Sequence, residues 1–141
     1  MSDIFTKTKR SEIMSKISGK ETKPEILVRK YLFSNGFRYR KNVKNLSGKP
    51  DIVLPKYKTI IFIHGCFWHG HEECKKSVLP TSNTEYWRDK IGKNIERDKI
   101  NISELEKRSW KVIVIWECEL KNATLRNNRL ELLVSEIYKP N

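Results

Sequence analysis

Histidine and cysteine, the residues most often used for proton transfer and for binding transition metals, are concentrated in one short stretch of this sequence. All three histidines and two of the three cysteines of the 141-residue chain lie between positions 62 and 74. An aromatic pair, Phe67 and Trp68, stands among them. We therefore read the rest of the chain in relation to this stretch.

Three residues of the stretch have the spacing of a metal-binding loop. Cys66, His71 and Cys74 follow the pattern C-x4-H-x2-C, and tetrahedral zinc accepts thiolate and imidazole donors together. Cys118 follows the apolar run 112–116, so the end of a predicted strand could bring a fourth ligand and close the site as a structural one. The alternatives are buried thiols or a disulfide. An odd number of cysteines and the lack of a recognisable signal peptide disfavour the disulfide.

The charge of the chain is strongly basic and unevenly distributed. The formal net charge is +12, and residues 1–49 hold thirteen Lys or Arg against four Asp or Glu. This excess favours a polyanionic partner such as nucleic acid, because neutralising phosphates releases counterions. An ordinary basic soluble surface would have the same composition, so charge alone does not decide. No apolar run is long enough to cross a membrane, and residues 1–20 carry too few apolar side chains for a membrane-surface helix.

The apolar pattern predicts one domain, residues 21–141, preceded by a basic N-terminal arm, residues 1–20. Its order predicts an α/β domain with a mixed central sheet flanked by helices. Trp110 and Trp116, in or beside a strand, are expected in the core. The expected strands are 37–40, 51–54, 59–63 and 112–116, and the expected helices are 22–35, 82–108 and 125–138.

Glu25 has two possible roles. It stands three residues after Thr22, which is the spacing of a capping box at the start of a helix. The pattern by itself favours capping, and a role in an active site is the alternative.

Asp51 and His64 stand at the ends of two consecutive predicted strands. If these strands are adjacent and antiparallel, the Asp51 carboxylate lies near the main-chain carbonyl of Ile63 and the ring of His64. A carboxylate and a carbonyl are oxygen ligands that suit Mg²⁺, which can polarise a phosphodiester and activate a water. His64 and His69 could supply hydrogen bonds or proton transfer near neutral pH.

Pro50 and Asp51 before an apolar strand also resemble the start of the PD-(D/E)xK nuclease motif. In that motif an acid and a lysine flank one residue of the second strand. Here Phe62 and His64 stand in those places, on either side of Ile63. This motif is degenerate and identifies little by itself.

A more specific resemblance comes from four blocks, residues 48–51, 62–71, 85–98 and 116–118. Together they resemble the very-short-patch repair (Vsr) endonucleases, over about residues 5–120. The string His-Gly-Cys-Phe-Trp-His at 64–69 is hard to obtain by chance. The resemblance implies a restriction-endonuclease-like fold, a structural zinc and a catalytic Mg²⁺. It also implies an enzyme that nicks DNA 5′ to the T of a T·G mismatch left by deamination of 5-methylcytosine.

The resemblance implies roles for particular residues. The magnesium ligands would be Asp51 and the carbonyl of Ile63. The catalytic set would be completed by His64, by His69 with Asp98 orienting it, and by Glu25. The zinc ligands would be Cys66, His71, Cys74 and Cys118. The predicted DNA contacts are Phe67, Trp68 and Trp87, which would wedge into the base stack, together with Met14, Lys49 and Lys93. The three rings could instead simply pack round the zinc loop.

The resemblance further implies a partner and a location. The partner is double-stranded DNA with a T·G mismatch, the location is the bacterial cytoplasm at the nucleoid, and mismatch-repair proteins are candidate partners. A monomer is expected, because nicking one strand needs one active site. Two rival functions are a non-catalytic zinc-containing module that binds mismatches and a related nickase in restriction or defence. Asp51 and His64 disfavour the module, because a protein that only binds has no use for an acid at the phosphate.

Overall fold

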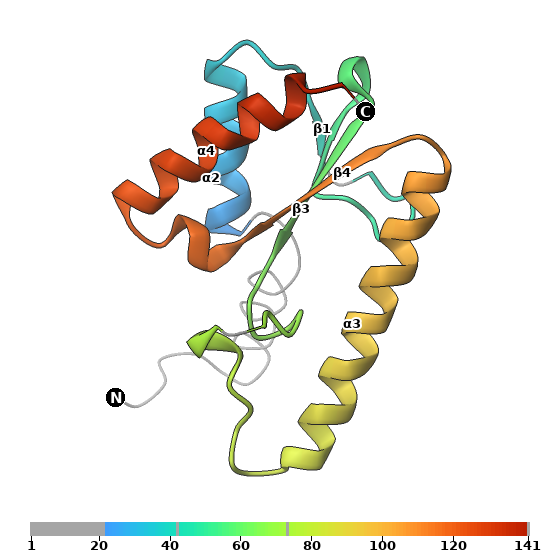
Figure 1. Cartoon of the computed structure of the whole chain (residues 1–141), viewed down its shortest axis with the longest axis vertical. Coiled ribbons are helices and arrows are strands. Elements are labelled where there is room, and N and C mark those ends of the chain that lie inside the picture. Colours follow the sequence, from blue (N-terminus) through green and yellow to red (C-terminus); the bar gives the residue numbers. More distant parts are fainter. Residues whose placement is uncertain (1–21, 42, 73, 141) are drawn as a thin grey trace, which may run out of the picture.

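The computed structural model describes residues 22–41, 43–72 and 74–140, so the predicted arm 1–20 and its Met14 lie outside the described residues. The described part is a mixed sheet with helices on both faces (Figure 1). Its strands are β1 (Arg40–Lys41), β2 (Ile52–Leu54), β3 (Thr59–His64) and β4 (Lys111–Trp116). Its α-helices are α2 (Lys23–Ser34), α3 (Thr84–Lys107) and α4 (Ala123–Tyr138). The predicted α/β class is confirmed.

The sheet is mixed, as predicted, with the strand order β1-β2-β3-β4. β2 is antiparallel to β1 and to β3, whereas β3 and β4 are parallel. A parallel pair needs a crossover connection, and the long helix α3 provides it. The register pairs His64 with Trp116, so the last residues of β3 and β4 are neighbours.

β3 is apolar on both faces because both faces are covered. Ile61 packs with Leu32 of α2 and Leu133 of α4 in one core cluster, whereas Ile60 and Phe62 pack with Leu105 of α3 in a second cluster. Figure 1 shows the same arrangement, with α2 and α4 on one side of the sheet and α3 on the other. Side chains alternate along a strand, so His64 points to the α3 side, like Phe62. The alternation of side chains along β3 therefore places the last residue of the strand, His64, on the side of the sheet that α3 covers.

The strand expected over 37–40 is wrong at its start, because β1 contains only Arg40 and Lys41. Phe37 instead terminates α2. Its N–H bonds the carbonyl of Leu32, Gly36 takes a positive φ of 88°, and the Phe37 ring is buried against Tyr57 and Tyr138. Phe37, which the alternation of apolar and basic residues placed in a strand, therefore ends a helix and packs in the core.

The helices otherwise match their expected ranges within a few residues. Thr22 caps α2 through Oγ1, which accepts the Glu25 N–H at 3.4 Å. α3 begins at Thr84 without a side-chain cap, after Asn83, whose backbone is left-handed at φ 55°. Within the residues described, no helix combines the length and the apolarity needed to cross a bilayer.

Candidate functional site

The antiparallel pairing of β2 and β3 brings Asp51 to the end of β3, as the sequence predicts. The last β2–β3 pair in this direction is Ile52 with Ile61, and Asp51 follows it toward the site. Its Oδ2 accepts the N–H of Ile63 at 2.7 Å. The carboxylate therefore takes the place of a strand partner and is held beside the main chain of Ile63.

The carboxyl of Asp51 is in an unusual electrostatic environment. Burial raises its pKa from 3.8 to about 7, the Ile63 N–H lowers it in part, and the charge and hydrogen bonding of Glu25 raise it further. Glu25 is only 4% exposed, and the Asp51 carboxyl beside it is partly buried. The N-cap of α2 is the Thr22 hydroxyl, which leaves the Glu25 side chain for Asp51. Two carboxyls at one buried point form a place where a cation would be stabilised.

The histidines form a stacked pair on the α3 side of the sheet. The rings of His64 and His69 are parallel within 2°, with centroids 3.8 Å apart. His69 Nδ1 lies 2.7 Å from Oδ2 of Asp98, which projects from the middle of α3. A carboxylate can only accept, so Nδ1 of His69 carries the proton, and in the neutral ring Nε2 is left as the acceptor. The predicted pairing of His69 with Asp98 is thus present in the structure.

His64 is the buried member of the pair. Burial lowers its pKa to about 4, the neighbouring His69 lowers it further, and Asp98 partly offsets both. The ring is therefore neutral near pH 7. Its Nδ1 has no hydrogen-bond partner among the residues the structure describes.

The two histidines and Asp98 do not form a metal centre as they stand, although their donor atoms lie within 4.8 Å of one another. The lone pair of an imidazole nitrogen lies in the plane of its ring. Two parallel planes whose ring centres are 3.8 Å apart cannot both direct a lone pair at one ion. The arrangement fits proton transfer better than metal binding.

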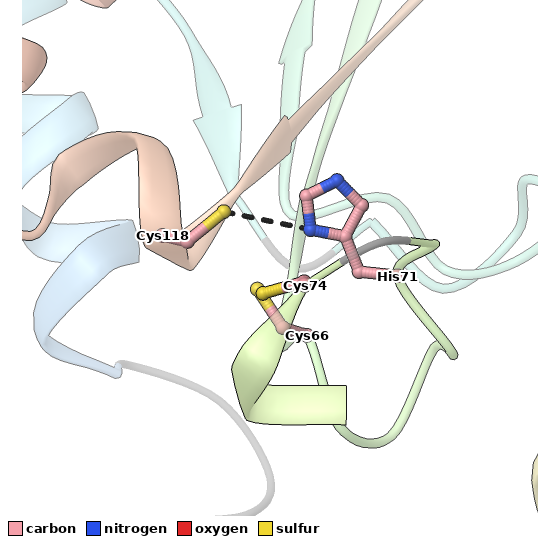
Figure 2. Close-up of side chains that lie close together, drawn as sticks. All are labelled: Cys66, His71, Cys74 and Cys118. Carbon is pink, nitrogen blue, oxygen red and sulfur yellow. Dashed lines mark hydrogen bonds between the residues drawn. The ribbon is translucent and has the colours of Figure 1, made fainter. Parts of the chain in front are cut away.

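Cys66, His71, Cys74 and Cys118 do form a group that can hold a metal ion. Their donor atoms lie within 4.8 Å of one another, and Figure 2 shows the four side chains facing a common point. Cys118 arrives from η3 (Glu117–Leu120), the turn of 3₁₀ helix that follows β4, as predicted. Two residues, Glu72 and Glu73, separate His71 from Cys74, and this spacing lets the loop close.

The separation between the donor atoms of Cys118 and His71 fits a tetrahedral ion. With bonds of about 2.3 Å to sulfur and 2.0 Å to nitrogen, tetrahedral geometry separates the two donors by about 3.5 Å. Cys118 Sγ lies 3.4 Å from His71 Nδ1. All three cysteines are free thiols, so a disulfide is excluded in this structure. Burial raises the pKa of Cys66 to about 12, which means that a buried thiolate here needs a cation.

The loop between β3 and Cys74 packs closely against α3. The N–H of His69 bonds the carbonyl of Gly65, and the side-chain amide of Asn94 on α3 donates to the carbonyl of Trp68 at 2.9 Å. Gly70 has φ 58°, and a Cβ there would meet Ile95 at 2.6 Å. This tight turn places His69 over His64 and leaves Trp68 at the surface.

The aromatic residues of the loop meet the start of α3. Phe67, Trp68 and Trp87 have ring centroids 5.3 to 5.8 Å apart in every pair, and Trp68 is 46% exposed. Tyr86 contacts Trp87 and is more exposed still, although the sequence analysis did not single it out. The rings do pack round the loop, and they also present a contiguous aromatic surface.

Lys49 and Lys93, two further predicted DNA contacts, are exposed. Lys49 has φ 49° in the turn that precedes Asp51. Lys93 lies on α3, where it pairs with Asp89 at 3.1 Å and lines a shallow surface groove together with Arg88 and Arg97.

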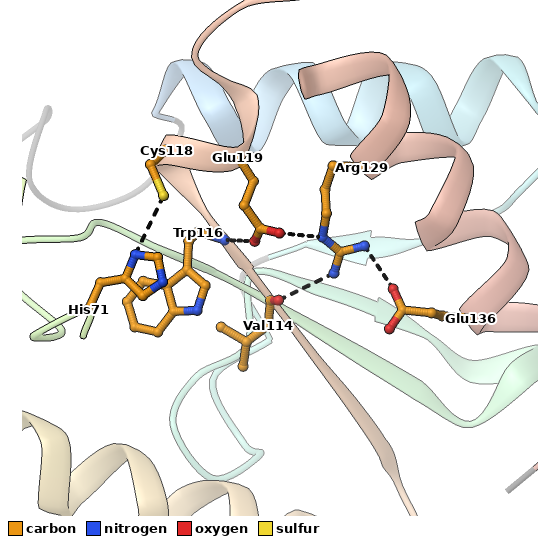
Figure 3. Close-up of polar contacts among 7 residues, drawn as sticks. All are labelled: His71, Val114, Trp116, Cys118, Glu119, Arg129 and Glu136. Atoms are coloured by element: carbon orange, nitrogen blue, oxygen red, sulfur yellow. Dashed lines mark hydrogen bonds and ion pairs between the residues drawn. The ribbon is translucent and has the colours of Figure 1, made fainter. Parts of the chain in front are cut away.

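Trp116 is a residue of the site that the sequence analysis wrongly assigned to the core. Its indole stacks on His71, with centroids 4.0 Å apart and planes within 5° (Figure 3), and forms a T-shaped pair with His64, with centroids 5.1 Å apart. A signal was available, because a parallel β3–β4 pair makes the strand-end residues neighbours. Trp110, by contrast, packs in the core cluster on the α3 side, as expected.

Comparison with known proteins identifies the family. Residues 2–76 match the family model described as DNA mismatch endonuclease Vsr. The type II nicking enzyme V.NmeAIP of Neisseria meningitidis serogroup A is 64% identical, over 97% of each chain. The type II nicking enzyme V.XorIIP of Xanthomonas oryzae pv. oryzae is 42% identical, over 90% of this chain and 96% of the relative.

A third relative carries the family name itself. The DNA mismatch endonuclease Vsr of Escherichia coli strain K12 is 40% identical, over 86% of this chain and 77% of the relative. The chain therefore belongs to the Vsr family of DNA mismatch endonucleases and is a DNA nicking endonuclease.

Proposed function

We propose that this protein is a magnesium-dependent, strand-specific endonuclease that nicks DNA 5′ to the T of a T·G mismatch, in very-short-patch repair of deaminated 5-methylcytosine. The observation that carries the proposal is the partly buried carboxyl of Asp51, which is bonded to Ile63 near the end of β3, the same strand end at which the stacked histidines lie. The Escherichia coli relative, named a DNA mismatch endonuclease, supports the choice of a mismatch as substrate.

Asp51 and the carbonyl of Ile63 are the proposed magnesium ligands, with Glu25 as the second acid. The fit rests on the buried carboxyl pair, because burial and the charge of Glu25 hold the pKa of Asp51 near 7 until a cation replaces the proton. Oxygen donors suit Mg²⁺. When bound, Mg²⁺ polarises the phosphodiester and activates a water.

His69 is the proposed proton-transfer group. Asp98 holds its Nδ1–H, so proton exchange with water or with the leaving oxygen takes place at Nε2. Asp98 also stabilises the ring when it is charged. Neutral, buried His64 supports the plane of His69 from behind, and its own hydrogen-bonding capacity faces the same site.

Zinc is the proposed ion of the Cys/His group, because three thiolates and one imidazole at tetrahedral distances are its preferred donors. All four coordination positions are filled by protein, which makes the site structural. Its task is to hold the loop that carries Phe67, Trp68 and His69. Elemental analysis should find one zinc per chain in the wild type and much less in Cys118→Ser.

The proposed DNA interface joins the aromatic surface to the basic face of α3. Phe67, Trp68 and Trp87 wedge into the base stack at the mismatch, where opening a poorly stacked step costs less than opening a normal one. Phosphates would be neutralised by Lys93 and its neighbours on α3 and by Lys49. Met14, outside the described residues, stays a predicted contact. We propose a monomer that acts at the nucleoid in the bacterial cytoplasm, with mismatch-repair proteins as candidate partners.

The decisive experiment is a nicking assay on end-labelled duplexes that differ only in one T·G mismatch. Wild type with Mg²⁺ should nick the T strand 5′ to the mispaired T, and Asp51→Ala should bind the duplex without nicking it. Glu131→Gln, which changes an exposed acid on α4, is the matched control and should nick normally. Binding without nicking by the wild type would favour the non-catalytic module.

A second candidate is a nickase that serves restriction or defence. The relatives named type II nicking enzymes support it. The same assay, run over a library of sequences around the mismatch, separates the two. Nicking of fully paired duplexes would favour the second candidate, whereas strict dependence on the mismatch would favour repair.

A further inference from the structure

Trp116 lies between the Cys/His group and the histidine pair. Its indole stacks on His71 and is steeply inclined to the rings of His64 and His69, at 75° and 73°, with centroid separations of 5.1 Å and 6.5 Å. It is the last residue of β4 and the register partner of His64. The side chain of Trp116 thus contacts both the proposed zinc site and the proposed proton-transfer site.

The main chain of Trp116 is held from two directions. Its N–H donates to Oε1 of Glu119 at 2.8 Å, and Oε2 of the same carboxylate pairs with Nε of Arg129 at 3.1 Å. Arg129 also donates through Nη2 to the carbonyl of Val114 at 3.4 Å. Figure 3 shows these contacts, which we call the bracket: the guanidinium of Arg129 binds the carbonyl of Val114 directly and reaches the N–H of Trp116 through Glu119.

Arg129 is itself fixed by burial and by charge. It is 9% exposed on α4, and its Nη1 binds Oε1 of Glu136 at 2.7 Å. A buried guanidinium with all three nitrogens engaged cannot leave its partners without uncovering an unpaired buried charge. The bracket is therefore stiff, and α4 sets the position of the end of β4 through it.

A second acid of the same turn binds the metal-binding loop. Glu117 Oε1 accepts the N–H of Cys66 at 3.2 Å. Glu117 and Glu119 stand on either side of Cys118 in the turn η3. Glu117 binds the loop that carries Cys66, and Glu119 binds Arg129 of α4. The main-chain N–H of Trp116 is therefore held by the same turn that supplies a proposed metal ligand, Cys118.

We propose that Trp116 is a positioning residue that couples the metal-binding group to His64, and that Glu119 and Arg129 set its orientation. This inference rests on the proposed function. A shift of the indole would move both His71, which stacks on it, and His64, which forms a T-shaped pair with it. A displacement of a reacting group by about 1 Å can cost on the order of a hundredfold in rate. Loss of the ring should lower the rate of nicking without weakening DNA binding.

The test compares Trp116→Leu with Trp110→Leu, a matched change just before the other end of β4, where the indole stacks on no histidine within the part of the chain that the structure describes. Single-turnover nicking by Trp116→Leu should fall at least roughly tenfold, with duplex affinity and metal content unchanged. Trp116→Phe should recover part of the rate. Arg129→Lys keeps the positive charge but loses the planar guanidinium that binds several partners at once, so its rate of nicking should lie between those of the wild type and Trp116→Leu.

A spectroscopic readout separates positioning from simple loss of fold. The chain has three histidines, so its imidazole carbon-bound proton resonances form a small set. The His64 and His71 resonances should shift together in Trp116→Leu and in Arg129→Lys, and not in Trp110→Leu. Equal rates and unmoved resonances in Trp116→Leu would overturn the inference. If the wild type nicks no substrate, the proposed function fails, and the resonances still decide whether Trp116 couples the two groups.

Discussion

Asp98 on α3 reaches across to the loop after β3 and binds Nδ1 of His69 at 2.7 Å, the shortest link between the helix layer and the stacked histidines. The two groups are each about a quarter exposed, at 29% and 23%. Both groups are therefore partly accessible to water. The contact orients the ring and leaves Nε2 free, which is the arrangement that general acid–base chemistry requires.

Replacing Asp98 with Asn should lower the rate of nicking while leaving DNA affinity nearly unchanged. The amide keeps the shape but cannot stabilise a charged His69, and general acid–base groups typically contribute about 10²- to 10⁴-fold. Single-turnover kinetics at saturating enzyme measures the loss. Glu106→Gln, an exposed acid on the same helix, is the control. A wild-type rate in Asp98→Asn would remove Asp98 from the proposed mechanism.

Most of the restriction-endonuclease-like fold could be predicted, because its elements have strong local patterns. The all-apolar β3 was expected at 59–63 and lies at Thr59–His64, since a strand covered on both faces needs no polar alternation. The Cys/His group could also be predicted, because three ligands lie in one loop and the fourth follows a strand. Family membership and endonuclease activity, expected from the motif blocks, are confirmed.

Two features were missed because they depend on the packing or pairing of elements that are distant in the sequence. Phe37 alternates like a strand residue, yet the ring fills a space between Tyr57 and Tyr138 that exists only after α4 docks. Trp116 looks like core in sequence, and only its register with His64 shows that it belongs to the site. The arginine that brackets it, Arg129, carries no local signal at all.

The stability of the magnesium-free protein should fall as the pH rises from about 4 to 7. The unfolded chain releases the Asp51 proton near pH 4, whereas the folded chain keeps it to about pH 7 because of burial and the charge of Glu25. Within this window the folded state binds more protons than the unfolded state. The contribution of Asp51 to the free energy of unfolding is therefore complete below pH 4 and is lost as the pH rises to 7, by at most about 4 kcal/mol.

Urea unfolding at pH 5 and at pH 7.5, with the Cys/His metal retained and Mg²⁺ omitted, measures this effect. Asp51→Asn should remove that part of the pH dependence and should be the more stable protein at pH 7.5. Mg²⁺ should stabilise the wild type at pH 7.5 and not the variant. Identical pH profiles for the two proteins would show that Asp51 ionises normally.

Gly70→Ala should destabilise the protein more than Gly36→Ala. Both glycines have positive φ, at 58° and 88°, so each alanine carries a backbone cost of about 1–2 kcal/mol. A Cβ at Gly70 would also meet Ile95 at 2.6 Å and Ile91 at 2.9 Å, whereas one at Gly36 meets nothing within 4 Å. Overpacking of this kind typically adds about 1–3 kcal/mol.

The free energies of unfolding of these two variants, from urea titration, give the comparison directly. Gly70→Ala should also reduce the rate of nicking, because the clash would lift the loop that carries His69 from α3. Gly36→Ala, at the end of α2, should nick normally once the fraction of folded protein is taken into account. Equal destabilisation by the two changes would mean that the loop does not press on α3 as closely as the structure has it.

Trp68→Ala should weaken binding to T·G duplexes while changing stability little. The ring is 46% exposed, so the folded protein loses little buried area. A base stacked on an aromatic side chain contributes about 1–3 kcal/mol, which corresponds to a loss of affinity between roughly fivefold and 150-fold. The matched control is Tyr138→Ala, an exposed ring that packs on Tyr57 just before β3 begins, at the opposite end of the strand from the histidines.

Fluorescence anisotropy on mismatched and fully paired duplexes distinguishes wedging from packing. If Trp68 opens the stack, the loss in Trp68→Ala should be larger for the T·G duplex than for the paired one, because only the mismatched step opens cheaply. Tyr138→Ala should bind both duplexes like the wild type even though it lowers stability. An equal loss on both duplexes would mean that Trp68 contributes general contact area, and mismatch selectivity would then have to come from other residues of the aromatic surface, of which exposed Tyr86 would be the next to replace.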